Sequence, residues 1–248
     1  MRTMRLDVGY DGTEFHGWQR QPGLRTVQGV LDEALSAVLG EPVRTVGAGR
    51  TDAGTHARGQ VASFVTDSAL PARAIVPVLR RRLPSDLEVR EARETGEGFD
   101  ARRSAVARRY SYRLLDGPDV LWQRHAWRPR GTLNADALCA AVRPLEGAHD
   151  CAAFRASGCT ALRSECMIHR AGWRRWEGGL LLDIVADHFL YHMVRNIVGT
   201  ALRAMTAADP ARAMSRVLAG RDRRRAGPTV PAHGLCLEHV FYPRESLS

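Results

Sequence analysis

The sequence predicts an α+β fold made of two consecutive β-α-β-β-α-β halves. Several short segments alternate apolar with polar residues, which indicates strands with one buried face. Longer segments carry apolar residues at helical spacing and begin at residues that favour helix N-termini. The same order of elements occurs twice along the 248 residues, and this order is that of the ferredoxin-like arrangement, which RNA-recognition domains share.

The first half begins with a strand at residues 4–10, where apolar side chains fall on one face. Thr26 has the position of an N-cap, and the helix that follows it is predicted to end at Gly40. The rest of this half is predicted as a strand, a second strand, a helix and a third strand, at residues 43–46, 60–65, 71–79 and 87–92.

The second half repeats this order, with one shorter helix added. Asn134 is a predicted N-cap, Pro210 a first-turn residue, and Glu177-Gly178-Gly179 the turn of a hairpin. The elements are strand 110–114, helix 134–145, strands 166–176 and 180–186, helices 189–205 and 210–220, and strand 235–242. We place the boundary between the halves so that the predicted domains are residues 1–105 and 106–248.

The charge balance indicates a polyanionic partner. The chain has 36 basic and 27 acidic residues, a net charge of +9 and a pI near 10.1. It contains no lysine, and the planar guanidinium of arginine suits both phosphate contacts and stacking on bases. A GC-rich genome would equally explain arginine in place of lysine, but not the net charge. Two halves with their sheets joined edge to edge would leave a long cleft for RNA.

Composition argues against several other classes of protein. The start of the chain shows no apolar region typical of a signal peptide, and no apolar run approaches the length of about 18 residues that a membrane helix needs. We therefore expect a cytoplasmic protein without membrane contact. The five cysteines are odd in number and form no C-x-x-C pair, so neither a disulfide framework nor a zinc site is expected.

The segment Gly47–Gly59, GAGRTDAGTHARG, is the candidate for chemistry. It lacks the G-K-[ST] of a phosphate-binding loop, and a strand rather than a helix follows it. Its glycines would allow close approach to a ligand. Asp52 lies between Arg50 and Arg58, and a neighbouring guanidinium favours the ionised form of a carboxylate, which can act as a nucleophile. The alternative is a structural aspartate that bonds to its own turn.

Five segments resemble motifs of the bacterial tRNA pseudouridine synthase A family, in the family's order. The segment GRTDAGTHA around Asp52 is similar to its central motif. The other similar segments are residues 10–21, 99–102 with 108–112, 189–199, and 231–235 with 240–243. The resemblance spans nearly the whole chain, and it implies a uridine isomerase that acts on folded RNA.

This resemblance implies roles for individual residues. Asp52 matches the catalytic aspartate, and Arg50 the arginine that opens the RNA and fills the gap left by the flipped base. Tyr110 matches the tyrosine that packs against the target uracil. Arg195 matches the basic residue that pairs with the aspartate from the second half. The family needs no metal or cofactor, works as a homodimer with one tRNA across both subunits, and acts on uridines 38 to 40 of the anticodon arm.

Further candidates come from the same motifs. We name Arg58, Arg20 and Gln28 as candidate substrate-binding residues. His56, His188 and His192 are expected to be packing or solvated residues rather than general bases, because the isomerisation can proceed with Asp52 and solvent alone. The run Arg221–Arg225 is either a solvated face or an RNA contact, and the sequence does not decide between them.

Three other functions fit parts of the pattern. An RNA-binding module without chemistry would carry aromatic residues on its central strands in a motif that is not found here. An N-glycosidase would use the same carboxylate but admit water and release free uracil. A synthase acting on a free nucleotide or on another RNA is compatible with every residue named above.

Overall fold

The structure, a computed structural model, describes residues 1–159, 161–243 and 245–247. These residues form two compact units. Unit 1 consists of Met1–Val106 with Cys236–Ser246, and unit 2 consists of Ala107–Leu235 with the end of the chain. The predicted domains differ from these units in the placement of Cys236–Ser246, and whether they are the folding domains stays a prediction.

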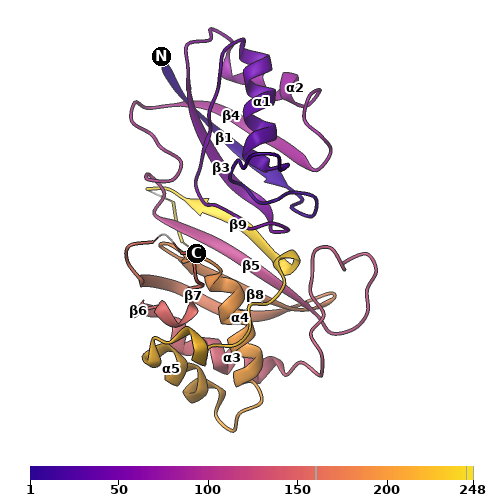
Figure 1. The fold of residues 1–248 in the computed structure, drawn as a ribbon, viewed down its shortest axis with the longest axis vertical. Helices are drawn as coiled ribbons and strands as arrows, with labels where there is room; N and C mark the ends of the chain where they lie inside the picture. Colours follow the sequence, from indigo (N-terminus) through magenta and orange to yellow (C-terminus); the bar gives the residue numbers. More distant parts are fainter. Residues whose placement is uncertain (160, 244, 248) are drawn as a thin grey trace. The chain divides into compact units, whose positions relative to one another are not determined.

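Unit 1 follows the order β-α-β-β-α-β and then receives the last strand of the chain (Figure 1). Its elements are β1 (Arg2–Tyr10), α1 (Val27–Leu39), β2 (Val46–Gly47), β3 (His56–Thr66), α2 (Ala72–Leu79), β4 (Leu87–Thr95) and β9 (Leu235–Phe241). The sheet has the order β4-β1-β3 with antiparallel pairing. Two further strands pair with β3 along different parts of its length. β2 pairs antiparallel, and β9 pairs parallel, with His56 opposite Cys236.

The core of unit 1 includes the face of its first strand that was predicted to be apolar, although Arg5 on the other face is buried as well. Met4, Leu6 and Val8 of β1 are fully buried, as are Leu31 and Leu35 of α1. The second helix, α2, packs against both α1 and β4. Burial of these large apolar side chains is the main source of stability for such a layer of helices on a sheet.

Helix α1 has the two predicted ends. Thr26 is in an extended conformation, and its side chain accepts a hydrogen bond from the Gly29 N–H at 3.3 Å. Gly40 ends the helix in the left-handed conformation with φ 74°, where a glycine has no steric penalty. Replacing Thr26 by alanine is therefore expected to lower the free energy of unfolding by about 1 kcal/mol. Urea denaturation measures this, and Thr26→Ser, which keeps the cap but loses the methyl group, should lose less.

The strand predicted at residues 43–46 is wrong for most of its length. The structure has a strand only at Val46–Gly47, because side chains of α1 bind the backbone just before it. Ser36 accepts from the Val43 N–H at 2.9 Å, and Asp32 accepts from the Thr45 N–H at 2.9 Å. A backbone N–H that is already bonded to a side chain cannot join a sheet ladder, so pairing begins one residue later.

Among its described residues, unit 2 contains four paired strands and three α-helices. Its elements are β5 (Ala107–Leu115), α3 (Ala135–Val142), β6 (Gly147–Asp150), β7 (Glu165–Trp176), β8 (Gly179–Ala186), α4 (Met193–Ala204) and α5 (Pro210–Gly220). The sheet order is β5-β8-β7-β6, antiparallel throughout. The predicted hairpin is confirmed, whereas the short strand β6 was not predicted. Both units are thus mixed α/β with mainly antiparallel sheets.

Helix α4 begins later than the sequence predicts. The apolar pattern indicated a helix over 189–205, but the first helical residue is Met193. His192 has φ 60°, in the left-handed region, which a right-handed helix cannot include. The Phe189 ring instead contacts the Tyr110 ring edge to face. Within the described part of the chain, every helix is too short or too polar to cross a lipid bilayer.

Candidate active site

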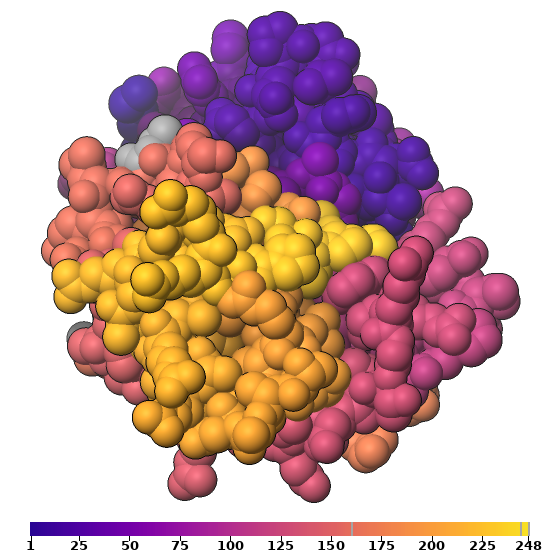
Figure 2. Space-filling model, turned by 60° about the horizontal axis from the view of Figure 1, so that its bottom comes forward, coloured from indigo at the N-terminus to yellow at the C-terminus, as the bar shows by residue number. Residues whose placement is uncertain are grey.

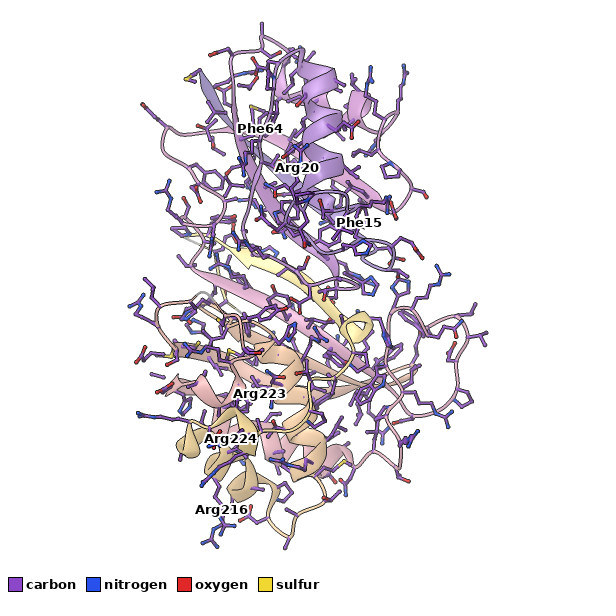
Figure 3. All side chains as sticks on the ribbon, in the orientation of Figure 1. Phe15, Arg20, Phe64, Arg216, Arg223 and Arg224 are labelled. Atoms are coloured by element: carbon purple, nitrogen blue, oxygen red, sulfur yellow. The ribbon has the colours of Figure 1, made fainter. Side chains whose placement is uncertain are left out.

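The loop that carries Asp52 connects β2 to β3 in unit 1. Asp52 is half-buried, whereas the side chains of Arg50 and Arg58 are exposed. The loop lies against the segment after β1, which contains Phe15 and Arg20, both labelled in Figure 3. Two guanidinium groups at the surface and a carboxylate with restricted solvent access therefore occur within nine consecutive residues.

Buried polar side chains fix the chain just before Asp52. The Thr51 hydroxyl lies 2.8 Å from the Tyr10 hydroxyl, and the Thr51 carbonyl accepts from the Trp18 N–H at 3.0 Å. Gln60 is fully buried and donates to the Gly49 carbonyl at 2.7 Å. None of Tyr10, Trp18 and Gln60 was a predicted site residue, although Tyr10 and Trp18 lie in the segment 10–21 that resembles a family motif. A signal for Gln60 existed, since it is a polar residue at the start of an apolar strand.

The chain just after Asp52 is fixed as well. The Thr55 N–H donates to the Asp52 carbonyl at 3.1 Å, and the Gly54 N–H donates to the Phe15 carbonyl at 3.3 Å. Gly54 has φ 77°, a conformation that glycine adopts without strain. Hydrogen bonds on both flanks therefore hold the backbone that carries the Asp52 carboxylate in one place.

Glycines of the opening segment permit this close contact between loops. A Cβ added to Gly17 would lie 2.6 Å from the Thr51 carbonyl oxygen, and one added to Gly12 would lie 2.1 Å from that of Thr55. We had expected the glycines of the Asp52 loop to leave room for a ligand. At the two ends of the loop they do not. Space beside Gly47 is filled by the Trp18 indole, and space beside Gly59 by the Glu238 carbonyl.

Gln28 and Arg20 are connected by a hydrogen bond. The Gln28 side chain is buried, and its carbonyl oxygen accepts from the Arg20 N–H at 3.0 Å and from the Gln19 amide at 2.9 Å. Its own amide group donates to the Thr45 carbonyl at 2.7 Å. These contacts let Gln28 position the backbone of Arg20, whose side chain is exposed. Direct contact of either residue with substrate stays a prediction.

The remaining candidates, Tyr110 and Arg195, belong to unit 2. Tyr110 lies on β5, is buried, and meets Phe189 with ring centroids 5.0 Å apart and an angle of 81°. Arg195 is half-buried on α4, and its Nε donates to the Val230 carbonyl at 2.7 Å. Arg195 therefore holds the segment that leads into residues 231–235.

Tyr112 holds the same segment one residue further on. Its hydroxyl donates to the Pro231 carbonyl at 2.7 Å, and its side chain is fully buried. Burial raises the pKa of Tyr112 above its ordinary value, and the Arg195 charge only partly opposes this, so the hydroxyl stays a neutral donor. The sequence did not decide whether Tyr112 is a core residue or a site residue. These contacts show a core residue that anchors the segment at residues 231–235.

His56 and His188 contact polar protein groups and His192 stacks on Tyr191, as expected for packing residues. His56 Nδ1 lies 3.0 Å from the Gly12 N–H and 3.1 Å from an Asp11 carboxylate oxygen. If the Gly12 N–H donates to Nδ1, that nitrogen carries no proton, so we treat the Asp11 contact as a short approach rather than an ion pair. His188 lies between Asp187, 3.0 Å from Nδ1, and the Cys166 sulfur, 3.4 Å from Nε2.

A carboxylate on a fixed loop beside exposed arginines is typical of an enzyme that acts on an anionic substrate. Comparison with known proteins specifies this class. The sequence profile of the family described as tRNA pseudouridine synthase matches residues 8–102 and 141–243, and the chain belongs to this family. Asp52, Arg50 and Arg195 lie inside the matched ranges, and Tyr110 lies between them.

Relatives match the chain over nearly its whole length. A tRNA pseudouridine synthase A from Geobacter sp. (strain M21) is 43% identical over 98% of this chain and 100% of its own. The protein of the same name from Citrifermentans bemidjiense is 45% identical over 98% of each chain. That from Myxococcus xanthus is 40% identical over 98% of this chain and 92% of its own.

Proposed function

We propose that this chain converts uridine to pseudouridine at positions 38 to 40 of the tRNA anticodon arm, with Asp52 as the nucleophile. Family membership makes the chain an isomerase of uridine in tRNA. The nucleophile and the positions are the proposed part. The positions rest on the resemblance, and the observation that carries the nucleophile is the half-buried Asp52 carboxylate on a loop that hydrogen bonds fix on both sides.

The reaction needs one group that attacks and an environment that excludes water. The N1–C1′ bond of uridine breaks, the C5–C1′ bond forms, the C5 proton leaves to solvent, and N1 gains a proton. A carboxylate can attack the ring or the sugar and leave again unchanged. Water in the site would hydrolyse the sugar and leave an abasic site, so partial burial of the carboxylate supports an isomerase over a glycosidase.

The resemblance supplies roles for the other candidates. The target base has to leave the helical stack before Asp52 can reach it, and Arg50, exposed on the same loop, is proposed to take its place. Tyr110 is proposed to pack against the uracil, and Arg195 to serve Asp52 as its cationic partner. Arg58, Arg20 and Gln28 are proposed to bind the RNA, the two arginines through phosphates.

The subdomain architecture, the location in the cell and the oligomeric state are also proposals. The element order and the β4-β1-β3-β2 strand order of unit 1 support a ferredoxin-like subdomain there. A second such subdomain in unit 2 and an RNA-binding cleft stay predictions from the sequence. Because tRNA is the substrate, we place the protein in the cytoplasm, and the resemblance supports a homodimer.

Tritium release tests the proposal directly. An unmodified tRNA transcript labelled with tritium at C5 of uridine should lose label to water when the protein is added. A matched transcript with cytidine at positions 38 to 40 should lose none. Full release from that transcript would refute the proposed positions. Free uracil as the product would indicate a glycosidase, and binding without release would indicate an RNA-binding module.

Gly17→Ala tests whether the fixed loop is required. The added Cβ would meet the Thr51 carbonyl and displace the residue before Asp52, so tritium release should fall by about tenfold or more, since small misplacements of reacting groups are costly. Gly23→Ala is the control. Gly23 has a similar φ of 73° but no neighbour within 4 Å, so that variant carries the same backbone strain and should keep its activity. Equal losses would mean that strain, not displacement, is responsible.

A further inference from the structure

A basic pocket in unit 2 plays no part in the reaction described above. It has a volume of about 990 Å³, near the upper end of the range of about 300–1,000 Å³ for small-molecule sites. Three segments and Thr229 line it, and Figure 2 shows two of the segments on the surface, the one near residue 155 in salmon and the one near residue 222 in yellow. The segments are residues 152–159, Tyr191–His192 and Arg221–Arg224. None of these residues is among the predicted catalytic or substrate-binding residues.

The pocket carries exposed positive charge. Arg155, Arg221 and Arg224 are exposed. Arg221 Nε lies 3.2 Å from an Asp150 carboxylate oxygen, and Arg224 makes a two-point contact with Asp222 at 3.0 Å. Such solvent-exposed ion pairs contribute little stability, so a phosphate can replace the carboxylates at small cost. Four arginines against one aspartate in the lining favour an anionic ligand.

The walls of the pocket are joined by one buried side chain. Asn196 is fully buried on α4, and its amide group donates to the Phe154 carbonyl at 2.7 Å. Its carbonyl oxygen accepts from Arg223 Nη2 at 2.9 Å and from the Thr229 hydroxyl at 2.6 Å. Arg223 also donates to the Gly227 carbonyl at 2.9 Å, so it builds the pocket wall, whereas the side chain of Arg224 is exposed. The pocket is therefore formed before any ligand binds.

An exposed aromatic ring lies at the rim of the same pocket. Tyr191 is 44% exposed and stacks on His192 with ring centroids 3.8 Å apart and an interplanar angle of 30°. Its carbonyl accepts from the Ala156 N–H at 3.1 Å, which joins it to the opposite wall. A stacked, solvent-exposed ring beside arginines is the arrangement with which proteins bind unpaired bases and their phosphates.

The backbone at the pocket supports a functional role. His192, with φ 60°, and Arg221, with φ 50°, are the only non-glycine residues with positive φ in the described part of the chain. Both line this pocket. A side chain in the left-handed region costs free energy, and such residues concentrate at binding and catalytic sites. Here the unusual conformation places an imidazole and a guanidinium in one cavity.

We propose that this pocket binds an unpaired nucleotide of the tRNA other than the uridine that reacts. Arg155, Arg221 and Arg224 contact its phosphate, and the exposed face of Tyr191 stacks on its base. This inference rests on the proposed function, because it assigns a second contact to the same substrate. It also decides between the two interpretations of the run Arg221–Arg225: Arg221 and Arg224 contact RNA, and Arg223 is structural.

The arginines are tested with a double variant, Arg221→Asn with Arg224→Gln. Asparagine tolerates the left-handed conformation of residue 221, so the fold should be kept. The control is Arg216→Gln with Arg225→Gln, which removes the same charge from exposed positions of unit 2 that do not line the pocket. Filter binding of an unmodified tRNA transcript across salt concentrations should show Kd raised about tenfold for the pocket variant. The salt slope should fall by about 1 for each phosphate that is no longer neutralised, and the control should change far less.

The base contact is tested with Tyr191→Leu. Removal of one stacking interaction should raise Kd for tRNA by about tenfold and leave the salt slope unchanged, because no charge is removed. Tritium release at saturating tRNA should stay near the wild-type rate in both pocket variants, since none of the changed residues is placed in the reaction.

Three results would overturn the inference. One is a loss of affinity in the pocket double variant no larger than in its control. Another is wild-type tRNA affinity in Tyr191→Leu. The third is tight binding of uridine monophosphate alone that disappears in the pocket variant while tRNA affinity is kept, which would make the pocket a site for free nucleotides. If the wild-type protein itself releases no tritium from tRNA, the proposed function fails, and this outcome is distinct from all three.

Discussion

Asp52→Asn is expected to reduce tritium release from C5-labelled tRNA by more than about 10³-fold, as removal of a nucleophile does in other enzymes. Asparagine has the shape of aspartate but carries no charge and cannot attack the ring or the sugar. The substitution leaves in place the hydrogen bonds of this loop with Tyr10, Phe15 and Trp18, which use its backbone or the Thr51 hydroxyl, so we expect the variant to fold and to bind tRNA. Single-turnover release, with Kd measured in parallel, separates the chemical step from binding.

Two matched variants sharpen this experiment. Asp52→Glu keeps the charge but moves the carboxylate by one methylene, and a displacement of about 1 Å is expected to lower the rate by about 10²-fold. Asp67→Asn makes the same chemical change at an exposed residue of unit 1 that pairs with the N-terminal amine, and it should release tritium at the wild-type rate. Full release by Asp52→Asn would remove Asp52 from the mechanism whatever the other variants do.

Arg195→Ala is expected to lower the single-turnover rate by about 10²-fold, the scale for removal of one preorganised electrostatic interaction, and to change tRNA affinity much less. The physical reason is that the proposed partner of the reacting carboxylate contributes its charge to the chemical step. A half-buried arginine beside the buried apolar residues of α4 is also costly unless an anion is close by. The measurement is the same pair of quantities, tritium release under single turnover and Kd for tRNA.

A structural role of Arg195 predicts a different result. Arg195 Nε holds the Val230 carbonyl, and the Tyr112 hydroxyl holds the neighbouring Pro231 carbonyl. Tyr112→Phe removes the second hydrogen bond without changing any charge, and it should keep most of the activity. If Tyr112→Phe loses as much as Arg195→Ala, the closing segment rather than the Arg195 charge is responsible. Unchanged catalysis with weaker binding would reduce Arg195 to a phosphate contact.

Most elements were predictable because their signals are local. The N-caps Thr26 and Asn134 each accept the expected backbone hydrogen bond, and the hairpin turn before Gly179 is where the glycines indicated it. Two predicted elements have the wrong bounds, each for a local reason, and the short strand β6 was missed. At residues 43–45 the side chains of α1 bind the backbone, and at His192 a left-handed residue delays α4. Periodicity reports burial and cannot report such contacts.

The site was predicted in part, for a similar reason. The sequence indicated the reactive loop, because a carboxylate between arginines has recognisable chemistry and the surrounding motif resembles a known family. It did not indicate Tyr10, Trp18 and Gln60, which hold the loop, because a residue that acts through packing has no chemical signature of its own. It also assigned the glycines of the Asp52 loop to ligand approach, whereas protein atoms fill the space beside Gly47 and Gly59.

By itself, the sequence determined the mixed α/β class and a net charge that suits an anionic substrate, since these follow from periodicity and composition, and its resemblance to a family named Asp52 as the candidate nucleophile. Only the tertiary structure decided how the Asp52 loop is immobilised, that the last strand pairs with β3, and that Tyr191, Arg155 and Arg221 line one pocket. Residues far apart in the chain make these contacts, and which of them come together depends on how all the elements pack.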